Sequence, residues 1–143
     1  MRCYHLYPLV WLLSLAVLAG CGDNRGLVPV SGTVTIDGKP LTVGQVMVSP
    51  EGHRQSIGPL DDQGRFTLTC YEKGDGAPVG TFPVAVMAVE QISERELRWH
   101  APRKYANELK SGITATIDGP TDDLKIELSW DGSRQKGPFV EKF

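Results

Sequence analysis

The stretch that decides the fold is VPVSGTVTIDG, residues 28–38, in which apolar and polar residues alternate. A period of two predicts a β-strand with one buried face, because successive side chains of a strand point to opposite sides. Asp37-Gly38 closes the stretch, and this dipeptide is typical of tight hairpin turns that need positive φ angles. Residues 28–38 therefore predict a strand that leads into an antiparallel hairpin.

The same alternation recurs along most of the chain, between turn-forming runs such as Pro50-Glu51-Gly52 and Asp61-Asp62-Gln63-Gly64. No succession of strands and helices supports a parallel α/β sheet, so we expect an all-β sandwich of two antiparallel sheets with about seven strands. The predicted strands cover residues 28–36, 41–49, 55–60, 65–71, 81–89, 113–117 and 124–128. The side chains expected to point inward are Val30, Val34, Ile36, Val46, Val48, Phe66, Leu68, Phe82, Val84, Val86, Ile113, Ile117, Leu124, Ile126 and Leu128.

Two residues inside the predicted strands carry expectations of their own. Pro83 cannot donate a ladder hydrogen bond, so its strand is predicted to lie at a sheet edge or to turn that position outward. Cys70 shares a strand face with Phe66 and Leu68. We interpret Cys70 as a small buried apolar residue, because a reactive thiol would need exposure and a nearby cation or histidine.

Two segments break the alternation. Residues 90–110 are charged and contain Ser93-Glu94-Arg95-Glu96, a pattern typical of a capping box. They predict a long crossover with one or two helical turns before Pro102. Residues 130–143 are predicted to form a partly ordered C-terminal tail.

The N-terminus has the pattern of a signal peptide. Leu6–Leu18 is almost wholly apolar, and Arg2 precedes it without any acidic residue. As a helix this run would span about 20 Å, which is less than the ~30 Å hydrocarbon core of a bilayer. Cleavage is therefore expected in preference to retention as a membrane span.

The end of the apolar run, Leu18-Ala19-Gly20-Cys21, resembles the lipobox of bacterial lipoproteins. The resemblance implies cleavage after Gly20 and fatty acylation of Cys21, which would anchor the chain in a membrane, because two or three acyl chains bind almost permanently. It also implies a location in the bacterial cell envelope, facing the periplasm or the exterior, and Gly22 resembles lipoproteins passed to an outer membrane. The alternative is a plain secretory signal in which Cys21 has no role.

Charge and cysteine content exclude two classes of protein. The 143 residues include 15 Lys and Arg against 17 Asp and Glu, a net charge of -2, so the basic excess of a dedicated nucleic-acid binder is missing. Cys3 falls in the predicted signal and Cys21 in the lipobox, which leaves Cys70 alone. A disulfide scaffold is therefore not expected.

Three groups of residues resemble carboxypeptidase regulatory-like domains. Residues 30–41 (VSGTVTIDGKPL) with 46–50 (VMVSP) resemble the opening of such a domain, and residues 61–68 (DDQGRFTL) resemble its next hairpin. The later runs 74–82, 104–105 and 111–115 extend the resemblance across roughly residues 28–129.

The resemblance implies a Greek-key sandwich of the transthyretin (prealbumin) type. With the lipobox, it implies a small lipoprotein with one such domain. The expected organisation is a signal peptide (1–20), a lipidated tether (21–27), the sandwich (28–129) and the tail (130–143). The family implies no biochemical activity, since a fold does not fix a function.

No constellation of catalytic residues is visible. Beyond the predicted signal, the only histidines are His53 and His100, which lack metal-ligand spacing, and the chain has no nucleophile elbow or phosphate loop. Asp61-Asp62 and Asp122-Asp123 are interpreted as turn residues in preference to calcium ligands. We therefore predict no enzymatic activity, no metal and no cofactor.

A possible contact surface is predicted from residues that strand alternation does not explain: Trp99, Arg103, Tyr105 and Trp130. Exposed rings stack on sugars or fill pockets of a partner. The alternative is that Tyr105 and Trp99 plug one end of the sandwich. The function expected is a non-catalytic protein-interaction or envelope-structural role, and the second hypothesis is a carbohydrate-binding module of the cell envelope. The expected partners are the membrane, through Cys21, and an envelope protein or polysaccharide.

Overall fold

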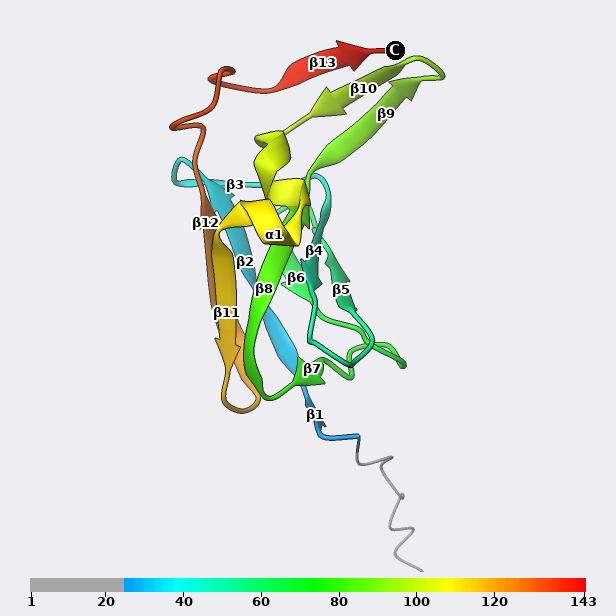
Figure 1. The fold of residues 1–143 in the computed structure, drawn as a ribbon, viewed down its shortest axis with the longest axis vertical. Helices are drawn as coiled ribbons and strands as arrows, with labels where there is room; N and C mark the ends of the chain where they lie inside the picture. The colour runs from blue at the N-terminus through cyan, green and yellow to red at the C-terminus, as the bar shows by residue number, and fades with distance from the viewer. Residues whose placement is uncertain (1–24) are drawn as a thin grey trace, which may run out of the picture.

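The computed structural model describes residues 25–143, so the predicted signal peptide and Cys21 lie outside the described residues. The described chain is mostly β, as predicted, with two one-turn helical segments (Figure 1). The elements are β1 (Leu27–Val28), β2 (Val30–Ile36), β3 (Lys39–Pro40), β4 (Gln45–Val48), β5 (Ser56–Pro59), β6 (Arg65–Thr67), β7 (Ala77–Pro78), β8 (Gly80–Met87), β9 (Val89–Ser93), β10 (Glu96–Trp99), η1 (Arg103–Ala106), α1 (Glu108–Ser111), β11 (Ile113–Ile117), β12 (Thr121–Leu128) and β13 (Phe139–Lys142).

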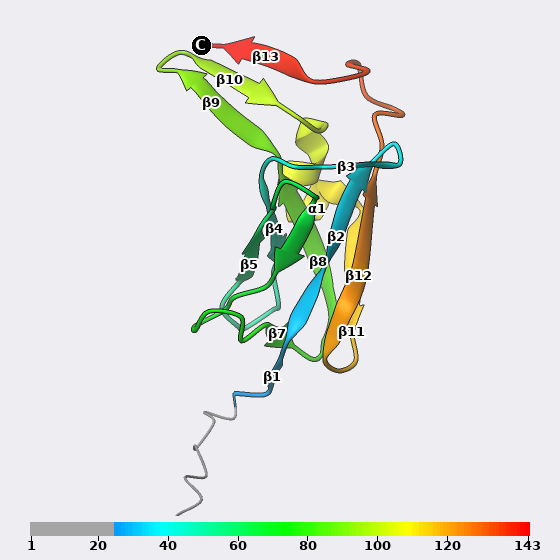
Figure 2. The same ribbon diagram turned by 180° about the vertical axis from the view of Figure 1, so that it is seen from behind.

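Two sheets form the sandwich. One has the order β11-β8-β4-β5, and the other has the order β12-β2-β3, with β6 paired to the first half of β2. Figure 2 shows the two layers from behind. All the side chains predicted to point inward belong to the core between the sheets: Ile36, Phe82, Ile113 and Leu124 are partly buried and the others are fully buried. The alternation of the sequence therefore identified the core correctly.

The hairpin predicted at Asp37-Gly38 is present but short. Asp37 and Gly38 have φ angles of 48° and 79°, and the turn pairs Ile36 with Lys39. The return strand does not run through residues 41–49 as predicted, because β6 occupies the same edge of β2 from Ser31 to Thr33. The chain leaves this sheet after β3, and β4 joins the opposite one.

One strand pair corrects the expectation of purely antiparallel sheets. β12 lies parallel to β2, along the edge that β3 and β6 leave open. The chain changes sheets at the short connection between β11 and β12, so β12 meets β2 in the same direction. The two backbones approach closely at Gly32, where an added Cβ would lie 1.9 Å from the carbonyl oxygen of Leu124.

Pro83 and Cys70 fit their surroundings in different ways. β8 lies between β11 and β4, so the first of the two alternatives predicted for Pro83, an edge strand, was wrong, and Pro83 itself is half-buried. Pro83 is tolerated because the β4–β8 pairing ends beside it: its carbonyl accepts from the Ser49 N–H at 3.2 Å, and it has no N–H to return. Cys70 is free and buried, as predicted.

The prediction for residues 90–110 was wrong in its first half. Ser93 and Glu96 pair at the turn of an antiparallel hairpin between β9 and β10, and they do not open a helix. The helical turns η1 and α1 follow Pro102, and the N-terminus of α1 is capped by Asn107, whose Oδ1 accepts from the Leu109 N–H at 2.9 Å. The C-terminal tail also contains a strand, because β13 pairs with β10 from Trp99–Phe139 to Glu96–Lys142.

Candidate functional site

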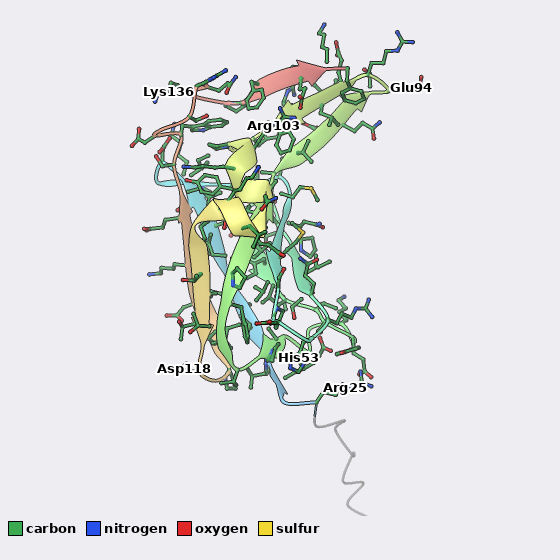
Figure 3. All side chains as sticks on the ribbon, in the orientation of Figure 1. Arg25, His53, Glu94, Arg103, Asp118 and Lys136 are labelled. Carbon is green, nitrogen blue, oxygen red and sulfur yellow. The ribbon has the colours of Figure 1, made fainter. Side chains whose placement is uncertain are left out.

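The predicted contact residues gather at one end of the molecule, beneath the three-stranded sheet β9-β10-β13, which we call the distal sheet. Figures 1 and 2 both show this sheet standing beyond the sandwich, at the end opposite to β1. Figure 3 places Glu94 and Arg103 there, and Arg25 at the other end. β1, the strand closest in sequence to the predicted tether, therefore lies at the end of the molecule that is remote from the distal sheet.

Three aromatic rings meet at the base of the distal sheet, and we call them the aromatic cluster. The rings of Trp99 and Phe139 are stacked, with centroids 6.5 Å apart and planes 14° from parallel. The ring of Trp130 meets Phe139 edge-on, at 6.3 Å and 72°. Both geometries are favourable for aromatic pairs. Phe139 thus joins two tryptophans that lie far apart in sequence.

Glu141 links Arg103 to this cluster. The Trp99 Nε1–H donates to Oε2 of Glu141 at 3.0 Å, and an Arg103 nitrogen lies 2.8 Å from Oε1. The Arg103 guanidinium also lies 5.3 Å from the centre of the Trp99 ring. These contacts fix β13 and η1 against β10, which accounts for an ordered strand within the tail that was expected to be only partly ordered.

Tyr105 and Trp130 are not available as open ring surfaces, since they are only 7% and 6% exposed. The Tyr105 hydroxyl lies 3.2 Å from both the nitrogen and the oxygen of the Ser129 backbone, and its ring belongs to the core. Tyr105 therefore plugs the end of the sandwich, as the alternative interpretation expects. Of the four predicted contact residues, Arg103 is exposed and Trp99 is half-buried.

A hollow of about 360 Å³ lies between the β2–β3 hairpin and the segment that leads to β13. Its apolar lining includes Ile36, Leu41 and Trp130, and its basic residues are Lys39, His100 and Lys136. Asp37 also lines the hollow, and its carboxylate accepts from the Ser129 hydroxyl at 2.7 Å. Sequence reasoning missed this hollow, because its walls come from three segments separated by many residues.

A larger groove of about 850 Å³ crosses the outer face of β2 and β6. Hydroxyl-bearing residues line much of it, and Asp61, Arg65, Lys73 and Asp122 supply its charges. The backbone N–H groups of Arg65 and Gln63, together with the Arg65 side chain, lower the pKa of Asp61. Asp61 is thus a turn carboxylate, as predicted.

The histidines and acidic residues stay dispersed. His53 is exposed in the loop before β5, whereas Nε2 of His100 lies 3.1 Å from Glu90 near the distal sheet. Among residues 25–143, no three His, Cys, Asp or Glu side chains are grouped to hold a metal ion. No helix in this range reaches the length and apolarity that a bilayer-spanning segment needs.

Comparison with protein-family models, with curated proteins and with solved structures finds no match to this chain.

Proposed function

We propose that this chain is a lipid-anchored envelope module that binds a partner protein through its distal sheet. The observation that carries the proposal is the placement of three exposed apolar side chains, two on that sheet and one on the residue that follows it. Ile92, Val140 and Phe143 are 42%, 44% and 70% exposed, on strands at its two outer edges and at the C-terminus. These three side chains lie on the two edge strands and at the end of one small sheet, and exposed apolar side chains are among those that protein contact sites use.

The proposed anchor is the acylated Cys21, and its support is the lipobox-like run 18–21. An anchor at this position would hold the β1 end of the domain near the membrane and leave the distal sheet at the far end (Figure 3). The module would then present its exposed apolar residues to other envelope proteins.

The proposed fold type is the Greek-key, transthyretin-like sandwich of carboxypeptidase regulatory-like domains. Its support is the order of the turn motifs together with the all-β sandwich they build. The proposal includes no catalytic step, since an interaction module acts by binding alone.

A sugar-binding role has weaker support. Stacking on a sugar needs an open ring face, and the rings of Tyr105 and Trp130 are covered. Trp99 has one face stacked against Phe139. Protein contact through Ile92 and Val140 therefore remains the proposed function.

A photo-crosslinking amino acid tests the proposal in living cells. Placed at Val140 of the full chain, it should give one discrete adduct of higher mass. The matched control is Lys125, which is also exposed on a strand but belongs to the sandwich. An absence of adducts at Val140, or identical adducts at Lys125, would contradict binding through the distal sheet.

A further inference from the structure

An exposed tyrosine lies between two arginines at the end of the molecule opposite to the distal sheet. The guanidinium carbons of Arg25 and Arg54 lie 4.4 Å and 5.6 Å from the centre of the Tyr71 ring. The three residues come from the chain before β1, the loop before β5 and the loop after β6. The fold therefore assembles this group from segments that are distant in sequence.

The loop that carries Tyr71 is held in place by Asp75. Its carboxylate accepts from the backbone N–H groups of Cys70, Tyr71 and Glu72 at 2.7, 2.9 and 2.9 Å. Burial opposes ionisation of Asp75, but these hydrogen bonds prevail and lower its pKa. Tyr71 is thus displayed from a fixed loop and is 45% exposed.

An exposed aliphatic side chain lies at the same end. Val79 is 54% exposed and follows Pro78, which pairs with Leu27 in the small β1–β7 sheet. We call Arg25, Arg54, Tyr71 and Val79 the base patch. Figure 3 shows Arg25 and His53 at one corner of this end and Asp118 at the opposite corner.

Acidic residues also lie near this corner. Glu51 and Glu72 are exposed in the same loops as Arg54 and Tyr71, and Lys73 adds a further positive charge. This end of the molecule therefore combines two arginines that contact an amphipathic ring with an exposed aliphatic side chain, and it is not a broad basic surface.

We infer that the base patch rests on the headgroups of a bilayer that contains anionic phospholipid. Guanidinium groups bind phosphate oxygens through paired hydrogen bonds, and tyrosine favours the interface between headgroups and acyl chains. The inference rests on the proposed anchor at Cys21, because four residues from Cys21 to Arg25 reach at most about 14 Å. Anchored so closely, the base patch meets the membrane surface.

The contact sets the orientation of the domain. An anchor alone would not set the orientation of the sandwich, whereas a second point of contact holds its β1 end at the membrane. The distal sheet then points away from the bilayer, where a partner can reach it.

The test uses the chain that begins at the acylated Cys21 and is otherwise complete. It is placed in vesicles of phosphatidylcholine, with and without phosphatidylglycerol. Flotation of the protein together with the vesicles reports whether the chain is anchored. Amide hydrogen exchange reports whether the base patch contacts the headgroups. We expect the loops around Arg54 and Tyr71 to exchange more slowly, by about threefold or more, when phosphatidylglycerol is present. Exchange around Ile92 in the distal sheet should not change.

Charge reversal separates the base patch from the anchor. Arg54→Glu should abolish the slowing while the protein still floats, and the matched variant Arg95→Glu, an exposed arginine at the distal turn, should keep it. If the loops exchange equally fast on the two kinds of vesicle while the protein still floats, the contact between base patch and membrane is contradicted and the anchor is not. A protein that does not float would overturn the anchor, and the base patch with it.

Discussion

At the scale of single residues, Gly32 shows how a position without a side chain permits a strand pairing. Its Cα faces the Leu124 carbonyl so closely that a methyl group would lie 1.9 Å from the oxygen. The sequence alternation assigned residues 28–36 to a strand, but it contained no sign of this approach, because the partner strand is about ninety residues away.

Replacing Gly32 should therefore weaken the β2–β12 contact. Gly32→Ala is expected to lower the free energy of unfolding by roughly 1–3 kcal/mol, because the added methyl group forces the backbones apart. Gly119→Ala is the matched control, since nothing lies within 4 Å of a Cβ there. Chemical denaturation measures both, and equal midpoints for Gly32→Ala and the unaltered protein would contradict the close approach.

Asp75 makes stability depend on pH in a predictable direction. Its pKa is lowered from 3.8 in the folded protein, so its contribution is present above that value and is lost as the pH falls through the folded pKa. Asp75→Asn should thus reduce the free energy of unfolding near pH 6, and the difference should shrink below pH 3.8. Denaturation at several pH values checks this. Asp62→Asn, which removes the charge of an exposed turn residue, is the matched control, and an equal loss of stability near pH 6 in that variant would contradict the role of Asp75.

At the scale of elements, the strands of the sandwich were predictable and those of the distal sheet were not. Strands with one buried face, such as β2 and β11, show the alternation that the core imposes. Residues 90–93 of β9 are all exposed, so burial left no pattern there. β9 is instead held by pairing with β10, and β10 by β13, some forty residues later. That long-range pairing also explains why a capping-box pattern failed to give a helix.

The aromatic cluster should control whether β13 stays attached. Phe139→Ala removes the ring that touches both Trp99 and Trp130, so we expect residues 139–143 to detach while the sandwich stays folded. Hydrogen exchange of β10 and β13 should accelerate by roughly tenfold or more, with little change in β8. Val140→Ala, at an exposed position of the same strand, is the control. Loss of protection in β8 to the same extent would contradict a separable distal sheet.

At the scale of the whole molecule, the sequence predicted the all-β sandwich and the residues of its core. It also named Trp99, Arg103 and Trp130, which the structure brings together around β13. It also offered the burial of Tyr105 as an alternative, but it could not predict that Trp130 would be covered, because Phe139, which packs against Trp130, lies in a segment without a local pattern. The placement of the base patch and the distal sheet at opposite ends of the molecule likewise could not be predicted, because each is assembled from segments that are distant in sequence.

The proposed orientation of the molecule depends most directly on the anchor, because the anchor makes one end proximal and the other distal to the membrane. Intact-mass analysis of the protein isolated from cell membranes tests it. We predict a chain that begins at Cys21 and carries diacylglycerol on its sulfur, with a fatty acid on the new amino group. A chain that retains residues 1–20, or one in which Cys21 carries no lipid, would contradict the central claim.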